Sequence, residues 1–596
     1  MLIASFFALI MSMQSLKNVS QAQEKLVSEA HSLLKKALGK NFKSAGDLIY
    51  PPKSEMGELS LPCFSLAKKL KKNPVEVAAD LAGKLKPKGP ISSVEAAGPY
   101  LNFRADQTVY ASLVLSEISK AGDKYGQSKV GKGKTWVVEY LSPNTNKPLT
   151  IGHLRNIFLG TTLSNTLKFL GYKVQRVTIN NDRGIAICKS QVAYEKWGKG
   201  STPKDKNEKP DHFVGRYYVM FNQKAQKDES LEELAKTCLR KWESNDAKVR
   251  AIWRQLITWV TTGYKQTLDN LGEKPMDFDY YESEIYQEGQ DIIDEGLSRK
   301  ILKTTDDGAV FAPLEVNYAK LPDKILRRKD GTALYATQDL HLAREKGKHQ
   351  PDMSVYIVGD EQSLYFRQLF ATLDALGIQK TDNLHHLSYG MIRLPDGKIK
   401  SREGIKKGTD ADGLIEMVKK MAIKSIVSRH KELSKKEIEK RAHKIALAAL
   451  RFYILRVESK TTMVFDPKAS VDLQGQTGPY LQYVYARINS VQKKAKARVG
   501  KVDYSKLAHE REQDLVKKLA RFPEAVGNVV AHYDPSELAT YLYDLAKSFS
   551  AFYEEVPIIK SADKETKNAR LGLIKSVQTV LGTGLELMGI EVLKEM

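Results

Sequence analysis

The sequence predicts an α/β protein. Its centre is a doubly wound, Rossmann-like parallel sheet, preceded by a small α+β domain and followed by an all-α domain. Three observations predict this organisation. Residues 136–179 read as strand, helix and strand, a βαβ unit that requires a parallel sheet. Two more strand patterns, separated by a helical one, lie within 353–392 and suggest the second half of the sheet. Residues 422–596 have helical patterns with no strand between them.

The first domain is expected over residues 15–125. Asn73 and Pro74 are typical of the N-cap and first position of a helix. A strand is predicted at 100–103, after the turn at Gly98. The helical pattern over 15–37 predicts an inner face made of Leu26, Ala30, Leu33 and Leu34.

The central domain is expected over residues 130–421. A strand at 136–140 is followed by a helical pattern that Gly171 ends, and then by a strand at 173–179. A surface insertion, with a charged and helix-poor start, is expected at about 199–275. The second half of the sheet then follows as strand, helix and strand at 353–358, 364–376 and 386–392.

The third domain, residues 422–596, is predicted to be a helical bundle. Its stretch from Arg487 to Lys501 contains six basic residues and no acidic one. Such a stretch is most simply a solvated helix face. In a strongly basic protein, however, it is also suited to follow the phosphates of a nucleic acid.

The composition is that of a folded and basic protein. Of 596 residues, 42% are hydrophobic and 28% charged, which excludes wholesale disorder and allows several cores. The formal net charge is +23. This excess predicts a polyanionic partner, either a nucleic acid or an anionic membrane surface.

No segment predicts a membrane span, so we expect no membrane partner. A spanning helix needs about 20 apolar residues, and the longest candidate, 2–13, is shorter. It lacks the preceding positive charge and the following cleavage site of a signal peptide. Residues 1–14 are therefore expected to be an unstructured leader, or to precede a true start at Met13, with a secretory signal as the less favoured alternative. The three cysteines fit no zinc or disulfide spacing, which predicts a reducing cytoplasm.

The most informative local segment is 146–155, with the sequence NKPLTIGHLR. It lies where a predicted strand ends and a helix begins, so unpaired N–H groups at the helix start can bind phosphate. Gly152 allows a nucleotide to approach the backbone, and His153 can donate a hydrogen bond to a phosphate oxygen. These ten residues alone are equally compatible with a plain helix start that carries a surface histidine.

A second segment, 395–404 with the sequence PDGKIKSREG, places three cations and a hydroxyl in a loop bounded by glycines. Such a loop can close over a polyphosphate leaving group as charge develops. Taken alone, it is more typical of a solvated charged turn. Its significance comes from its pairing with the first segment in one doubly wound domain.

These two segments resemble the HIGH and KMSKS signatures of class I aminoacyl-tRNA synthetases, and the chain around them is similar to the arginyl-tRNA synthetase family. Residues 478–487 resemble the opening of that family's helical anticodon-binding (DALR) domain. Further stretches follow in the family's order at 139–144, 180–184, 334–339, 356–362 and 388–391.

The resemblance implies an arginine–tRNA ligase that uses ATP with Mg²⁺. Arginine would be activated as an adenylate and transferred to the 2′-hydroxyl of the terminal adenosine of tRNA(Arg). The resemblance also implies that activation itself requires bound tRNA, that no editing domain is present, and that the protein is a cytoplasmic monomer. Two alternatives stay open: a related class I synthetase or nucleotidyltransferase with another substrate, and a catalytically inactive paralogue that only binds RNA.

The resemblance places Glu139, Tyr335 and Asp339 around the guanidinium of arginine, with Asn144 and Gln362 nearer its backbone. Carboxylates suit this role because they accept paired hydrogen bonds from a planar guanidinium. From the residues alone, Glu139 could be a surface charge at a strand end, and Tyr335 and Asp339, four residues apart, a pair on a helix surface.

The chain departs from the family's signatures at two positions. The first His of HIGH is Thr150, which leaves one ATP contact in doubt, and the second Lys of KMSKS is Ser401. A Lys just upstream of HIGH is thought to replace the latter, and Lys147 stands there. We therefore expect Lys147 and Lys398 to be the phosphate cations, with His153 as the hydrogen-bond donor.

The remaining ATP-binding residues are implied by the same resemblance. Thr150, Gly152, His153 and Lys398 belong to the two signatures, and Arg402 is a helper or a loop-surface charge. Tyr365 is expected to stack on adenine, although a core aromatic is an equally good interpretation.

Five residues are expected to contact tRNA. Tyr100 and Asn102 match a segment that touches the tRNA elbow in relatives, or are an ordinary pair of strand residues. Tyr483 and Arg487 lie one helical turn apart, which suits base stacking with a phosphate or base-edge contact. Met596, at the chain end, is expected near the anticodon.

Overall fold

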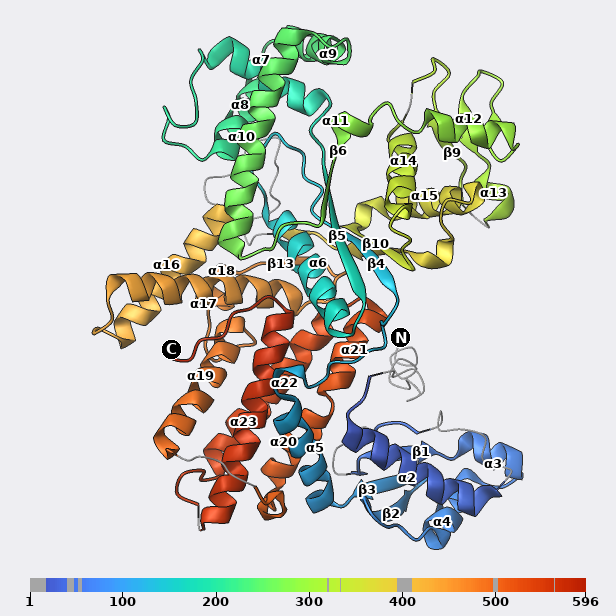
Figure 1. Ribbon diagram of the computed structural model, residues 1–596, viewed down its shortest axis with the longest axis vertical. Coiled ribbons are helices and arrows are strands. Elements are labelled where there is room, and N and C mark those ends of the chain that lie inside the picture. Colours follow the sequence, from blue (N-terminus) through green and yellow to red (C-terminus); the bar gives the residue numbers. More distant parts are fainter. Residues whose placement is uncertain are drawn as a thin grey trace. The chain divides into compact units, whose positions relative to one another are not determined.

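In the computed structural model the chain forms two compact units (Figure 1). One contains residues 131–478. The other combines 1–130 with 479–596. The structure describes residues 18–39, 48–51, 56–318, 321–332, 334–393, 410–496, 502–561 and 563–596.

A five-stranded sheet forms the centre of unit 131–478, in the order β11-β10-β4-β5-β6. All four strand pairs are parallel. β10 pairs directly with β4, so the two predicted halves join in one sheet, and the predicted doubly wound fold is confirmed. The strands are β4 (Thr135–Glu139), β5 (Lys173–Asn180), β6 (Phe278–Tyr281), β10 (Met353–Gly359) and β11 (Leu384–Tyr389).

The helix α6 (Ile151–Phe169) connects β4 to β5 and is buried along most of its length. Gly160 allows this close packing, because a Cβ there would lie 2.3 Å from Cγ of Tyr140. The fully buried Arg155 donates to the carbonyls of Gly390, Thr461 and Glu458 at 2.6, 2.9 and 3.0 Å. Arg155 therefore holds the segment after β11 against α6.

Further helices belong to this unit. They are α7 (Ile185–Trp197), α11 (Glu282–Ile285), α12 (Gln290–Ser298), α13 (Leu314–Asn317), α14 (Tyr335–Gly347) and α15 (Ser363–Leu376). A small antiparallel sheet, with the order β7-β8-β9, precedes α14. Its strands are β7 (Lys303–Thr304), β8 (Val310–Ala312) and β9 (Lys324–Arg327).

The predicted insertion is a helical layer. It contains α8 (Pro210–Ala225), α9 (Ser230–Glu243) and α10 (Ala247–Leu271). Aromatic side chains hold this layer to α7: the ring of Phe213 lies 5.3 Å from that of Trp259, edge to face, and 6.2 Å from that of Tyr194.

The predicted boundary between residues 421 and 422 needs correction, because it falls inside the continuous helix α16 (Ala411–Arg429). Unit 131–478 also includes α17 (Lys435–Leu455), α18 (Pro467–Ser470) and a two-stranded ladder of β12 (Ile392–Arg393) with β13 (Met463–Val464). In α17, the buried Arg451 forms an ion pair with Glu273 at 2.5 Å, and its guanidinium lies 4.6 Å from the ring of Phe158 in α6. The apolar faces of these helices thus belong to the core of this unit, which helical periodicity alone cannot reveal.

The amino-terminal part of the other unit is an antiparallel sheet, β1-β3-β2, with helices. The predicted inner face of α2 (Gln21–Leu38) is buried, and Asn73 caps α4 (Pro74–Lys84) by accepting from the N–H of Val75 at 2.9 Å. Both predictions are confirmed. The other elements are β1 (Leu59–Pro62), α3 (Phe64–Leu70), β2 (Ile91–Ala97), β3 (Tyr100–Ala105) and α5 (Gln107–Ala121).

The carboxy-terminal helices pack against this amino-terminal part and share its unit. Lys517 forms an ion pair with the buried Glu58 at 2.8 Å, and Tyr125 donates to the carbonyl of Leu519 at 3.1 Å. Two segments predicted as separate domains therefore share one core. The helices are α19 (Gly478–Ala495), α20 (Glu510–Ala520), α21 (Phe522–His532), α22 (Ser536–Glu555) and α23 (Lys564–Leu587).

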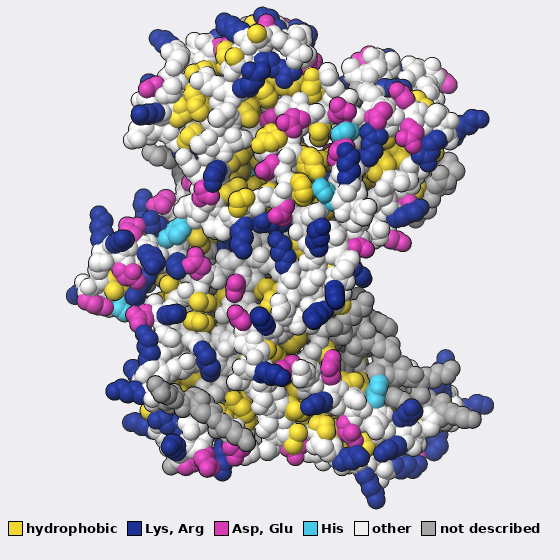
Figure 2. All heavy atoms as spheres, viewed as in Figure 1, with side chains coloured by type: hydrophobic (Ala, Val, Ile, Leu, Met, Phe, Trp, Pro, Cys, Tyr) yellow, Lys and Arg dark blue, Asp and Glu magenta, His cyan; other side chains and the backbone are white. Residues whose placement is uncertain are grey.

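Over the described residues, no helix is both long and apolar enough to span a membrane. On the face shown in Figure 2, Lys and Arg side chains are spread over the visible surface.

Candidate active site

The loop between β4 and α6 carries Asn144 and Lys147 along the carboxyl edge of the sheet. Asn144 is exposed and forms a parallel bridge with Asn181, just beyond β5. Lys147 is half-buried. The loop therefore lies at the place where ligands bind in open parallel sheets.

Thr150 and His153 form the start of α6. The N–H of Thr150 donates to Nδ1 of His153 at 2.9 Å, and the Thr150 hydroxyl lies 3.0 Å from the same nitrogen. Because Nδ1 accepts a hydrogen bond, the proton of the neutral imidazole is assigned to Nε2, which is then a donor. Burial, together with the charge of Lys147, lowers the pKa of His153 to about 4. His153 is thus an uncharged donor near neutral pH, and Thr150 fixes its tautomer.

A cavity of about 210 Å³ lies beside these residues. It brings together Lys147, Gly152 and His153, three of the predicted phosphate-site residues. Lys398 and Arg402 lie outside the described residues. The other lining residues are Thr150, Ile151, Gly359, Glu361, Tyr389, Met391 and Ile392.

Glu361 lines the same cavity and was not among the predicted site residues. It belongs to the short 3₁₀ helix η5 (Asp360–Gln362), directly after β10. A Cβ at Gly359 would lie 2.2 Å from a carboxylate oxygen of Glu361. The glycine therefore makes room for this carboxylate. The position of Glu361 directly after a strand of the parallel sheet is the feature of the sequence that could have identified it as a site residue.

A second group of side chains is an acidic cluster, in which the charges of Glu139 of β4 and Asp339 of α14 interact. Glu139 is only 5% exposed and is ion-paired with the buried Lys346, so it is not a surface charge. Asp339 accepts a hydrogen bond from the hydroxyl of Tyr365. Burial raises the pKa of Asp339 to about 6, and the charge of Glu139 adds to this effect. Asp339 is half-buried, and its bonded partner is on α15 and not at the surface of its own helix.

Glu282 of α11 is an acidic residue of this region that sequence reasoning missed. It is 7% exposed and lies 3.8 Å from the guanidinium of Arg183. Burial raises its pKa to about 7; Arg183 opposes this shift, while Asp182 and Asp339 add to it. No local pattern marks Glu282, because its relation to Asp339 exists only in the folded chain.

The remaining arginine-site predictions lie at the surface of the same region. Tyr335 begins α14, one turn before Asp339, and is 72% exposed. Gln362 is exposed at the end of η5, next in the chain after β10. The side chains of Tyr335, Gln362 and Asn144 are thus accessible to a ligand.

Tyr365 contacts the acidic cluster and a neighbouring aromatic ring. Its hydroxyl donates to Asp339, its ring packs edge-on against Phe366 at 5.6 Å, and Lys324 lies 4.5 Å from its centre. Tyr365 is not among the residues that line the 210 Å³ cavity. Its stacking on adenine stays a prediction, beside the alternative of a core aromatic.

In the carboxy-terminal helices, Arg487 of α19 lies against two tyrosine rings. Its guanidinium is 4.5 Å from the ring centre of Tyr483 and 5.1 Å from that of Tyr553, which is 37% exposed. The last residues of the chain run along the same helix: Lys493 is paired with Glu595 at 2.6 Å, which brings the neighbouring Met596 to α19.

In the amino-terminal sheet, Tyr100 is half-buried and packs edge-on against the exposed Phe64, with ring centres 5.7 Å apart. Asn102 is only 4% exposed, so at this end of β3 the accessible side chain is that of Tyr100.

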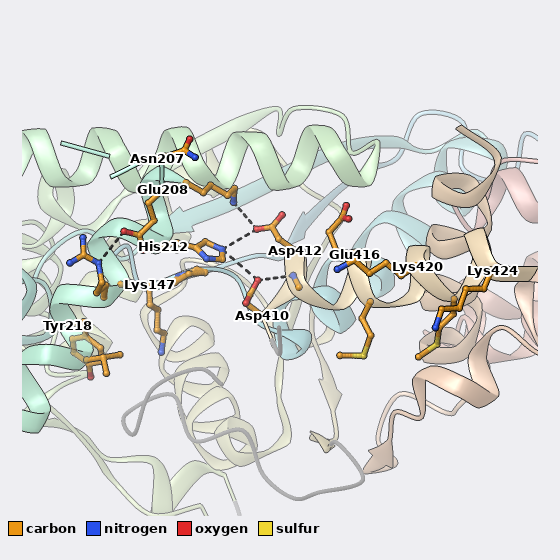
Figure 3. A pocket seen from close by; sticks show the side chains of 18 residues that line it. Lys147, Asn207, Glu208, His212, Tyr218, Asp410, Asp412, Glu416, Lys420 and Lys424 are labelled. Atoms are coloured by element: carbon orange, nitrogen blue, oxygen red, sulfur yellow. Dashed lines mark hydrogen bonds and ion pairs between the residues drawn. The ribbon is translucent and has the colours of Figure 1, made fainter. Parts of the chain in front are cut away.

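A larger cavity, of about 1040 Å³, lies between α8 and α16 and also includes Lys147 (Figure 3). Asp211, His212 and Asp412 offer donor atoms within 4.8 Å of one another, a spacing that could hold a metal. However, the ammonium group of Lys209 lies 3.0 Å from Asp211 and 2.8 Å from Asp412. This cation already compensates the carboxylates, so the cluster does not fit a metal site.

Three family models match the chain in succession. Residues 18–105 match "Arginyl tRNA synthetase N terminal domain", residues 114–466 "tRNA synthetases class I (R), catalytic domain", and residues 481–596 "DALR anticodon binding domain".

Similar proteins span almost the whole chain. The arginine–tRNA ligase of Treponema denticola is 40% identical over 561 residues, which covers 92% of this chain and 94% of the relative. That of Phocaeicola vulgatus is 36% identical and covers 96% and 100%. The solved structure of Thermus thermophilus arginyl-tRNA synthetase matches with a TM-score of 0.81 at 25% identity, covering 96% of this chain and 100% of that structure.

Proposed function

The chain belongs to the arginyl-tRNA synthetase family of class I, and from this membership we infer that it ligates L-arginine to tRNA(Arg) in a reaction that uses ATP. The observation that carries this conclusion is 40% identity to an arginine–tRNA ligase over nearly the full length of both chains. As in other members of the family, the reaction proceeds through an aminoacyl-adenylate.

Activation consists of attack by the arginine carboxylate on the α-phosphorus of ATP, with pyrophosphate as the leaving group. Such a reaction needs positioning and charge stabilisation more than a side-chain nucleophile. We assign the donor at the phosphates to Nε2 of His153, and the cations to Lys147 and Lys398. Among the described residues, a Cβ at Gly152 would meet only the Thr150 hydroxyl, at 3.6 Å. This part of the chain therefore leaves room for a side chain there, and approach of a nucleotide would explain the glycine. ATP is expected to bring Mg²⁺.

The acidic cluster supports arginine as the amino acid. Burial raises the pKa of both Asp339 and Glu282, and the nearby cations offset this effect only in part. A guanidinium placed among Asp339, Glu139 and Glu282 would supply the missing positive charge. A neutral side chain would not supply this charge, so the acidic cluster disfavours the alternative of another class I substrate.

The remaining assignments concern tRNA and organisation. We assign Tyr100, Tyr483, Arg487 and Met596 to tRNA contacts, and propose that Asn102 supports Tyr100. For the domains we propose a tRNA-contacting part up to residue 125, a catalytic part that extends from 131 to 478, and an anticodon-binding bundle after it. We also propose that the protein is a cytoplasmic monomer and that its activation step requires tRNA.

ATP–pyrophosphate exchange with arginine, run with and without tRNA(Arg), tests this function. Exchange that requires both arginine and tRNA is the expected result. Exchange with a different amino acid would overturn the assignment of the acidic cluster. Intact tRNA binding without exchange under any condition would favour the inactive paralogue, and Thr150→His would then test whether the altered signature is the cause.

A further inference from the structure

The insertion helices α8 and α10 contact the loop that carries Asn144 and Lys147. Tyr264 of α10 is 5% exposed, and its hydroxyl lies 2.9 Å from the carbonyl oxygen of Asn144 and 2.8 Å from that of Lys147. One buried hydroxyl therefore contacts the backbone of both Asn144 and Lys147, the two loop residues that are proposed to contact the substrates.

The helix α8 reaches the same loop through Gly215. A Cβ at this position would lie 2.7 Å from Cδ of Pro148 and 3.3 Å from Cα of Lys147. The backbone of α8 is thus in direct contact with the loop, and only glycine permits this approach without displacement.

The same two helices also hold the start of α16. Lys209, at the cap of α8, lies 2.8 Å from Asp412 and 2.6 Å from the hydroxyl of Thr267 in α10. Thr267 in turn donates to Asp412 at 3.1 Å. The residue before α16, Asp410, is bridged to Thr150 at the start of α6, and His212 lies beside Asp410 and Asp412 in Figure 3.

We propose that Tyr264 is a positioning residue for amino-acid activation, which acts by fixing the backbone of Asn144 and Lys147. The inference rests on the proposed function of these two residues. Asn144 is exposed and Lys147 has a long side chain, so neither could hold its geometry without a fixed main chain. Misplacement of a catalytic group by about 1 Å can lower a rate by roughly 100-fold. The insertion is thereby part of the activation machinery and not only a surface addition.

The test is Tyr264→Phe, compared with Tyr194→Phe. Tyr194 is 7% exposed and its hydroxyl also donates to a backbone carbonyl, that of Ser201 at 3.1 Å, away from the loop. The two variants therefore lose the same kind of buried hydrogen bond. In arginine-dependent ATP–pyrophosphate exchange with tRNA, we expect Tyr264→Phe to lower kcat about tenfold and to raise KM for arginine several-fold. Tyr194→Phe should match the wild type.

A double-mutant cycle separates positioning from general destabilisation. If Tyr264 acts through Lys147, the effect of Tyr264→Phe on the rate of single-turnover adenylate formation should be much smaller in a Lys147→Ala background. An equal loss in both backgrounds would overturn the action through Lys147, and equal kinetics of Tyr264→Phe and Tyr194→Phe would overturn the inference. Thermal unfolding of the two single variants should be similar.

Gly215→Ala provides a second variant from the other helix. Its added methyl group should displace Pro148 and Lys147, lower kcat, and leave tRNA affinity unchanged. A wild-type rate for this variant would contradict the contact. Failure of the wild-type protein itself to exchange with arginine and tRNA would refute the proposed function and not the role of Tyr264 alone.

Discussion

Replacement of Asp339 by Asn removes one negative charge from the acidic cluster and preserves the shape of the side chain. The amide oxygen can still accept from the hydroxyl of Tyr365, so the packing around α14 should persist. At pH 7.5 the carboxyl group, with a pKa of about 6, is mostly ionised. The substitution therefore isolates the interaction between this charge and the guanidinium of arginine.

The magnitude follows from Coulomb's law. Two unit charges about 4 Å apart attract by about 4 kcal/mol at an effective dielectric constant of about 20. The neutral amide can accept one hydrogen bond from the guanidinium, which recovers about 1 kcal/mol. The net loss of about 3 kcal/mol corresponds to roughly 150-fold in kcat/KM for arginine. KM for ATP should stay within about twofold, because Asp339 is not among the residues that line the phosphate cavity.

The assay is tRNA-dependent exchange at varied arginine and varied ATP. Glu345→Gln is the matched control: it lies on the same helix, but its carboxylate is paired with Lys348 at 2.6 Å. Citrulline, a neutral analogue of arginine, tests the charge directly, and the preference for arginine over citrulline should shrink in Asp339→Asn. A loss of less than tenfold in kcat/KM for arginine, or an equal loss in the control, would refute the assignment of Asp339.

Three further predictions address other parts of the molecule. Lys147→Ala should lower the rate of single-turnover adenylate formation by roughly 100-fold, because a cation at the phosphates acts mainly in the transition state. Its tRNA affinity, measured by filter binding, should be unchanged. A wild-type rate would show that Lys147 does not act at the phosphates. Arg487→Ala should weaken tRNA binding and reduce the slope of log affinity against log salt by about one. Arg511→Ala should change the slope less, because Arg511 is already paired with Glu555 at 2.8 Å. Equal slopes for the wild type and both variants would show that Arg487 is a solvated surface charge. Arginine affinity should fall as the pH is lowered, because protonation of Asp339, with a pKa of about 6, removes the acceptor charge. Calorimetry should show about a tenfold loss of arginine affinity between pH 7 and pH 5, and release of protons on binding at pH 6. An arginine affinity that does not change with pH would contradict the raised pKa.

The local pattern of the sequence determined most of the elements and the phosphate site. Helical patterns identify α2, α6 and α15, the capping residues identify α4, and short β-rich runs identify the strands β4, β5, β10 and β11, because each signal is set by neighbouring residues. The residues of segment 146–155 that were predicted to share a phosphate site also lie together in the folded chain, because Lys147, Gly152 and His153 line one cavity. Residues close together in sequence at a strand–helix turn stay close together in space.

Only the tertiary structure decided which residues from distant segments meet. Helical periodicity indicates that α16 has an apolar face but not which core it joins, so the domain boundary was placed inside the helix. The contacts of Tyr365 with Asp339, of Glu139 with Lys346, and of Tyr264 with the backbone of Lys147 connect residues that are 26, 207 and 117 positions apart. Such contacts depend on how the helices pack across the sheet, and a local pattern contains no information on that packing.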